Sequence, residues 1–185
     1  AQESWAGRTA YNRGQILYRA AEMMEARRPE FVSVLRQIGV TPKAASKQVD
    51  QAIDRWVWYA GWADKTHHIL GTVNPVAGPY FNFTFPEPTG VVGVMAPDEP
   101  ALLGLVSRLA AVIVSGNTAV AVVEGPASLA AITLAEVLAT SDLPGGVVNL
   151  LTGDKNELLP WMMGHLDINA VDLTGAPEDL DPTIL

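Results

Sequence analysis

The sequence predicts an α/β protein built on a parallel sheet, and three observations support this fold class. Three β-branched runs, Val91–Met95, Thr118–Val123 and Val147–Leu151, alternate with segments of helical length. The runs are rich in valine and are followed by glycine or proline, which is typical of parallel strands covered by helices on both faces. Ligands of such sheets bind beyond the carboxyl ends of the strands. The segments to examine for function therefore directly follow each strand: Ala96–Pro100, Glu124–Pro126 and Gly153–Lys155.

Composition limits the classes of protein to which the chain can belong. Of its 185 residues, 49% are hydrophobic and 17% are charged, so the chain can bury a sizeable core and global disorder is not expected. A net charge of −8 argues against nucleic acid and anionic membranes as partners. The sequence contains no cysteine, which excludes disulfides, thiolate metal sites and a cysteine nucleophile within it.

No targeting or membrane segment is expected. Ala1–Gly14 lacks a basic start followed by an apolar run, so we find no signal-peptide pattern and expect a cytoplasmic protein. The apolar stretch Ala101–Val123 has nearly the length of a membrane span. Arg108 and the turn residues Ser115–Asn117 divide it into a helix and a strand instead.

The first third of the chain is predicted to be helical. Apolar residues recur at helical spacing over Arg13–Ile38, with Asn12 as the predicted cap and Pro29 as the point of separation or kinking. Thr41-Pro42 then begins a long helix that we expect to continue from Ala44 to about His67. Its aromatic residues are interpreted as core or subunit contacts rather than as a cofactor site.

The segment between this helix and the first strand of the sheet has the pattern of a β-hairpin. Phe81, Phe83 and Phe85 alternate with polar residues, which gives one face of the hairpin an aromatic surface. A lone hairpin is marginally stable in water. The phenylalanines therefore need to be covered by the rest of this chain or by a second subunit.

The remaining chain completes the alternation of strands and helices. Helices are expected at Ala101–Ser115 and Ser128–Thr140, a short helix at Asn156–Gly164, and a fourth strand at Asn169–Leu173. We expect one domain, residues 1–185, divided into N-terminal helices, a hairpin insertion at 69–86, a sheet core at 88–175 and an acidic tail at 176–185.

Several motifs in a fixed order resemble a known family. They are Tyr59–Lys65, Glu87–Val94, Ser115–Thr118 and Leu143–Asn149. Together they resemble the cofactor-binding half of the NAD(P)-dependent aldehyde dehydrogenases, over nearly the whole chain. The resemblance implies a Rossmann-like sheet and NAD or NADP as cofactor. It also implies an oligomerisation hairpin at 69–86 that contacts a second copy of the chain or a catalytic dehydrogenase unit.

The residues after the first strand depart from the family pattern. Where the family has alanine, proline, tryptophan, asparagine, phenylalanine and proline, this chain has Ala96, Pro97, Asp98, Glu99, Pro100 and Ala101. The family asparagine, which helps to bind the substrate oxyanion, falls on Glu99. An ionised carboxylate cannot donate a hydrogen bond to an oxyanion, and its charge opposes one. We therefore assign no catalytic residue to this chain.

The implied cofactor positions are also altered. The family lysine, proline, serine and glutamate after the second strand fall on Val122, Val123, Glu124 and Gly125, so the groups that grip the adenosine ribose are missing. After the fourth strand Thr174-Gly175 is kept, but the next serine is Ala176 and a later glycine falls on Leu180. The resemblance implies the following cofactor-binding positions, which we expect to be degenerate: Pro97, Asp98, Glu99, Val122, Glu124, Gly153, Thr174 and Gly175.

Charge gives an independent argument against a dinucleotide. Helix N-termini attract anions, but Asp98 and Glu99 lie at such a terminus and are expected to cap its N–H groups themselves. With Glu124, three carboxylates lie at this edge, and the first two post-strand loops have no lysine or arginine. One repulsion at about 4 Å costs roughly 1 kcal/mol in water and about 4 near a protein surface. NAD affinity is therefore expected to fall by several powers of ten.

Three functional hypotheses follow. The first is a non-catalytic dehydrogenase-like unit that assembles with a catalytic partner, similar to the degenerate second unit of some two-unit aldehyde dehydrogenases. The second is a fragment of an NAD(P)-dependent aldehyde dehydrogenase whose catalytic cysteine and general-base glutamate lie elsewhere. The third, less favoured, is a small-molecule or cation-binding module that reuses the crevice. No ligand spacing supports a metal site from the three carboxylates, and we expect none at the adjacent pair His67-His68 either.

Overall fold

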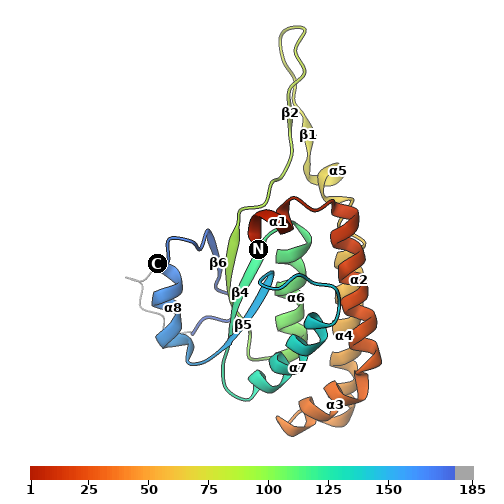
Figure 1. Cartoon of the computed structure of the whole chain (residues 1–185), viewed down its shortest axis with the longest axis vertical. Helices are drawn as coiled ribbons and strands as arrows, with labels where there is room; N and C mark the ends of the chain where they lie inside the picture. Colours follow the sequence, from red (N-terminus) through yellow and green to blue (C-terminus); the bar gives the residue numbers. More distant parts are fainter. Residues whose placement is uncertain (178–185) are drawn as a thin grey trace.

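A parallel four-stranded sheet lies at the centre of the computed structural model, which describes residues 1–177 (Figure 1). Its strands are β3 (Val91–Met95), β4 (Thr118–Val123), β5 (Val148–Thr152) and β6 (Ala170–Asp172). Their order across the sheet is β5-β4-β3-β6, and every pairing is parallel. The predicted α/β class is confirmed, and each strand lies within one residue of its predicted bounds.

The helices are distributed unequally over the two faces of the sheet (Figure 1). α6 (Ala101–Val114) and α7 (Ala127–Ala139) cover one face, and α2 (Ala10–Ala26) and α4 (Pro42–Ala60) pack behind them as an outer layer. α3 (Arg28–Gln37) joins α2 to α4. The opposite face carries only α8 (Lys155–Met163) among the described residues. The main core therefore lies between the sheet and the α2–α4 layer.

The start of the chain differs from the prediction in two respects. A short helix, α1 (Gln2–Ala6), precedes α2, and its Trp5 is fully buried. The cap of α2 is Thr9, whose hydroxyl accepts the N–H of Asn12, so the predicted Asn12 cap was wrong. The predicted separation at Pro29 is confirmed, because α2 ends at Ala26 and proline occupies the first turn of α3.

The long helix beginning at Pro42 is shorter than predicted. α4 ends at Ala60, residues 61–65 form turns, and α5 (Thr66–Leu70) follows. The apolar spacing continues past Ala60, and this is why the pattern predicted one helix to about His67. The long stripe of α4 nevertheless faces the core, with Trp56 fully buried, whereas Trp58 is 52% exposed.

The loops that enter β3 and β4 are held together by the turn residues before β4. The Asn117 side-chain oxygen accepts the N–H of Gly90 at 2.8 Å, and its amide group donates to the Ser115 hydroxyl. Gly116 between them has a φ of +91°, and a Cβ there would lie 2.8 Å from Pro88. Glycine is therefore required at this position.

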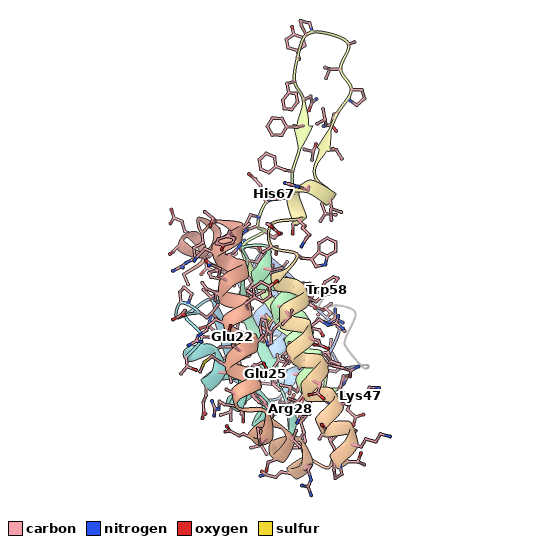
Figure 2. All side chains as sticks on the ribbon, turned by 90° about the vertical axis from the view of Figure 1, so that its right-hand side faces the viewer. Glu22, Glu25, Arg28, Lys47, Trp58 and His67 are labelled. Atoms are coloured by element: carbon pink, nitrogen blue, oxygen red, sulfur yellow. The ribbon has the colours of Figure 1, made fainter. Side chains whose placement is uncertain are left out.

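The predicted hairpin is present and projects from the body of the molecule (Figure 1). It pairs β1 (Thr72–Val73) with β2 (Phe83–Thr84). Phe81, Phe83 and Phe85 form an exposed aromatic row, with ring centroids 5.2 and 5.6 Å apart. Figure 2 shows His67 at the base of this projection, where its ring lies 5.9 Å from that of Phe85. Within residues 1–177 these phenylalanines are not covered by the chain itself.

No helix in the described part of the chain has both the length and the apolarity needed to cross a membrane.

Candidate functional site

The predicted cofactor positions come together at one edge of the sheet, formed by the carboxyl ends of its strands. Pro97, Asp98 and Glu99 follow β3, Glu124 follows β4, and Gly153 follows β5. Thr174 and Gly175 follow β6, and the N–H of Gly175 donates to the Met95 carbonyl at 3.1 Å. Because all four strands are parallel, their ends necessarily meet at this edge. We refer to it below as the carboxyl edge.

The loops after β3 and β6 pack backbone against backbone at the carboxyl edge. A Cβ on Gly175 would lie only 2.3 Å from the Ala96 carbonyl oxygen, so only glycine allows this approach. Thr174 is exposed, and its N–H donates to the Asp172 carboxylate at 2.9 Å. Thr174 and Gly175, which match the family pattern after the fourth strand, therefore shape the loop after β6 in this structure.

Val122 differs from the other predicted positions because it is a core residue. It lies within β4, is fully buried and packs with Met95, Leu159 and Met162 beneath α8. A side chain that the resemblance equates with a ribose-binding lysine thus contributes only apolar contact here.

A lysine from the third loop supplies the positive charge of the carboxyl edge. The Lys155 ammonium lies 2.6 Å from an oxygen of Asp98, and the Lys155 side chain is only 2% exposed. Asp98 is 66% exposed. Lys155 begins α8 after β5, whereas Asp98 follows β3, so the lysine side chain reaches across the end of the intervening strand β4.

The N-terminus of α8 is bonded by carboxylates of this chain. The Lys155 N–H donates to Glu124 at 3.3 Å. The Asp154 carboxylate accepts the N–H groups of Asn156 and Glu157, at 2.8 and 3.2 Å, and is the cap of the helix. The free N–H groups that make a helix N-terminus attractive to phosphate are therefore already occupied.

The N-terminus of α6 is also bonded internally, but not by the predicted residues. Pro100 occupies the N-cap position, and neither Asp98 nor Glu99 accepts a hydrogen bond from the first turn, so that prediction was wrong. Instead the Gln48 side-chain oxygen, from α4, accepts the Leu102 N–H at 2.9 Å.

An open hollow of about 880 Å³ lies at the same edge, on the α6–α7 side. Its lining includes three carboxylates, Asp98, Glu99 and Glu124, together with Gln48 and the first residues of α6 and α7. Two helix N-termini, those of α6 and α7, face a space whose charged side chains are all acidic. This combination opposes an anionic ligand, because the carboxylates offset the positive ends of the helices.

No three histidine, aspartate or glutamate side chains within residues 1–177 gather as a group that could hold a metal ion. His67 and His68 lie on α5 at the base of the hairpin, away from the carboxyl edge (Figures 1 and 2). Leu180 and most of the acidic tail lie outside the described residues.

Sequence reasoning missed the two residues that organise this site, Lys155 and Gln48. Lys155 lies in one of the three post-strand segments, but the local sequence gives no sign that its ammonium reaches Asp98. Its partner Asp98 is 57 positions away, and Gln48 is 54 positions from Leu102. The available signal for Lys155 was its place one residue after a capping aspartate, at the start of a helix on the carboxyl edge.

Comparisons with known proteins place this architecture in a family. Residues 1–178 match the model of the aldehyde dehydrogenase family. The chain is 33% identical to omega-crystallin of Enteroctopus dofleini, over 94% of this chain and 35% of that protein. It is 32% identical to human cytosolic 10-formyltetrahydrofolate dehydrogenase, over 94% of this chain and 20% of that protein.

A solved structure gives the same result. The NAD+ complex of an aldehyde dehydrogenase from Bacillus cereus superposes with a TM-score of 0.84 at 28% identity, over 90% of this chain and 34% of that chain. The chain spans about a third or less of the length of these relatives. Both sequence and fold assign it to the same group, and the chain belongs to the aldehyde dehydrogenase family.

Proposed function

We propose that this chain is a dehydrogenase-like unit that does not itself bind a dinucleotide or catalyse a reaction, and that it acts by assembly beside a catalytic dehydrogenase unit. The observation that carries the proposal is the internal bonding at two of the three helix N-termini at the carboxyl edge, those of α6 and α8, whereas α7 begins at Ala127 with no side-chain cap. Gln48 accepts from α6, whereas Asp154 and Glu124 accept from α8. A diphosphate arriving there would have to displace these groups.

Side-chain chemistry supports the same proposal. Glu99 replaces an oxyanion donor by an acceptor, and Val122 replaces a ribose-binding cation by a buried apolar group. The one lysine at the carboxyl edge, Lys155, is buried in an ion pair with Asp98. The chain also contains no cysteine that could attack an aldehyde.

The exposed hairpin supports the assembly role. Phe81, Phe83 and Phe85 are 74%, 53% and 46% exposed. Exposed aromatic rows of this kind favour burial against another protein surface. The partner that we propose is a second copy of this chain or a catalytic dehydrogenase unit, which would oxidise an aldehyde to a carboxylic acid with NAD or NADP.

Calorimetric titration of the chain with NAD and NADP tests the first part of the proposal. We expect no binding in the micromolar range, because carboxylates line the carboxyl edge, its lysine is already paired with Asp98, and the N-termini of α6 and α8 are bonded within the chain. The aldehyde dehydrogenase from Bacillus cereus, known as an NAD+ complex, is the positive control. Micromolar affinity for either dinucleotide would contradict the proposal.

Light scattering on size-separated samples tests the second part. Replacing Phe81, Phe83 and Phe85 by serine should lower the oligomer mass of the chain, or weaken its binding to a catalytic unit. Leu129→Ser with Ile132→Ser is the matched control, because both side chains are exposed on α7. If both sets of substitutions lowered the oligomer mass equally, the hairpin would have no specific role in the proposed interface.

A second candidate function remains, because the fold matches an NAD+ complex at a TM-score of 0.84. In this reading the chain is the cofactor-binding part of an NAD(P)-dependent aldehyde dehydrogenase whose catalytic half is supplied elsewhere. The same titration separates the two candidates, since this one requires dinucleotide binding.

A further inference from the structure

We infer that Asp98 is an internal occupant of a latent anion site, in which the Lys155 ammonium would otherwise hold a polyphosphate. The inference rests on the proposed function, because it concerns the same carboxyl edge, and it adds a cause specific to this chain. The Asp98 carboxylate takes the place of the ligand anion, so the contact is autoinhibitory.

The burial of Lys155 carries the first step. Its side chain is 2% exposed, although lysine is almost never fully buried without a partner. Taking an ammonium out of water costs several kcal/mol unless an anion compensates its charge. Within residues 1–177, the ion pair of Lys155 is made with Asp98 alone, at 2.6 Å. Lys155 therefore depends on that carboxylate.

The position of the pair carries the second step. Lys155 follows β5 and Asp98 follows β3, so the ammonium lies over the end of β4 at the carboxyl edge. In open α/β sheets this edge is where ligands bind. A positive charge held at this edge by a buried lysine is the feature that an anion site requires.

The exposure of Asp98 carries the third step. The carboxylate is 66% exposed, whereas its partner is buried, so the pair is open to solvent on the Asp98 side only. An anion can therefore approach Lys155 along the path that Asp98 now fills. Removing the Asp98 charge should leave the buried ammonium without a counter-charge, which a small multivalent anion can then supply.

The neighbouring charges set how strong the latent site can be. Glu99 and Glu124 remain at the carboxyl edge, and Asp154 caps α8. These carboxylates lower the affinity of any anion for Lys155. They do not replace Asp98 as its partner, since Glu124 accepts the backbone N–H of Lys155 and not its ammonium. We therefore choose inorganic pyrophosphate, which is small and highly charged, as the probe.

The test is a set of thermal unfolding measurements with pyrophosphate, at an ionic strength matched with sodium chloride. Asp98→Asn should lower the unfolding midpoint, because it leaves the buried ammonium without its counter-charge. Pyrophosphate should restore part of that loss in Asp98→Asn. Its affinity for this variant should exceed its affinity for the wild type by about tenfold or more, the factor given by 1.4 kcal/mol.

Three variants isolate the cause. Asp98→Asn with Lys155→Met should show no response to pyrophosphate, because the cation is gone. Asp54→Asn, which removes an exposed carboxylate from α4, controls for the change in net charge. Asp98→Ser serves as a second test should Asp98→Asn not fold, since its shorter, neutral side chain removes the charge and also leaves room for the anion.

The possible results separate this inference from the proposed function. The inference is overturned if pyrophosphate stabilises the wild type as much as the Asp98 variants, or if it stabilises none of them. Micromolar binding of NAD by the wild type would instead contradict the proposed function. In that case the Asp98 variants would still decide whether the carboxylate competes with anions at Lys155.

Discussion

The two faces of the central sheet are stabilised in different ways. On one face, α6 and α7 pack against the strands and are themselves covered by α2 and α4, which gives a continuous apolar core. On the other face, the buried apolar core within residues 1–177 consists of Met95, Val122, Leu159 and Met162. We call these the thick face and the thin face.

The thin face is also incompletely covered. An apolar hollow of about 310 Å³ lies beside α8, and Trp161 at its border is 76% exposed. Polar contacts also fix α8 on this face, because its first turn is held by the Lys155–Asp98 ion pair and by the Asp154 cap. The comparison indicates that the thick face determines global stability, whereas the thin face determines the position of α8.

The largest expected effect is on the thick face. Trp56→Ala removes a fully buried indole from the C-terminal part of α4, where it contacts the main core. Loss of a buried aromatic side chain leaves a cavity and should lower the free energy of unfolding by about 3–5 kcal/mol. Chemical denaturation measures it. Trp58→Ala is the control, because that ring is 52% exposed, and the loss of its contacts with Tyr59 and Trp62 should change the value by about 1 kcal/mol.

The corresponding change on the thin face should cost less and act more locally. Leu159→Ala empties a buried site beneath α8 and should cost about 2–3 kcal/mol, since the open surroundings can partly collapse onto the space. Hydrogen exchange should accelerate in α8 while α6 keeps its protection. Leu166→Ala is the control: its side chain is 97% exposed, so the free energy of unfolding and the hydrogen exchange of α8 should stay unchanged. Uniform acceleration across α6 and α8 would mean that the two faces unfold as one unit.

The same contrast explains what could be predicted from the sequence. The strands and the helices of the thick face have strong signals, because β-branched runs and apolar periodicity follow directly from burial. The runs at Val91–Met95 and Thr118–Val123 match β3 and β4 residue for residue. The aromatic alternation likewise identified the hairpin, because it depends on nearest neighbours along the chain.

The carboxyl edge could be located but not described from the sequence. Strand order alone places the post-strand residues together, whereas the partner of each side chain depends on three-dimensional distances. Asp98 as a helix cap was the reasonable local prediction, yet it bonds Lys155, and Gln48 from another helix takes the cap role. The end of α4 at Ala60 was missed for a similar reason, since apolar spacing continues through the following turn.

The smallest expected effect on stability comes from ion pairs on the surface of the thick face, and it depends on pH. Arg27 bonds Glu30 and Glu136, and Arg28 bonds Asp50 at 2.7 Å, which links α3 to α7 and α4. Hydrogen bonds from these arginines lower the pKa of Glu30 and the pKa of Asp50 below their ordinary values of 4.5 and 3.8. A carboxylate whose pKa is lowered by folding stabilises the native state above its unfolded pKa.

This stabilisation should be present at neutral pH and be lost as the pH falls through the lowered pKa values of Glu30 and Asp50. Glu30→Gln with Asp50→Asn should therefore flatten the acid side of the curve of melting temperature against pH and change little at its acid end. Both carboxylates are exposed, so salt should weaken the difference. Glu25→Gln with Asp54→Asn is the control, because neither forms an ion pair within residues 1–177. An equal flattening by the control pair would show that general charge repulsion, rather than the α3 ion pairs, sets the acid sensitivity of the thick face.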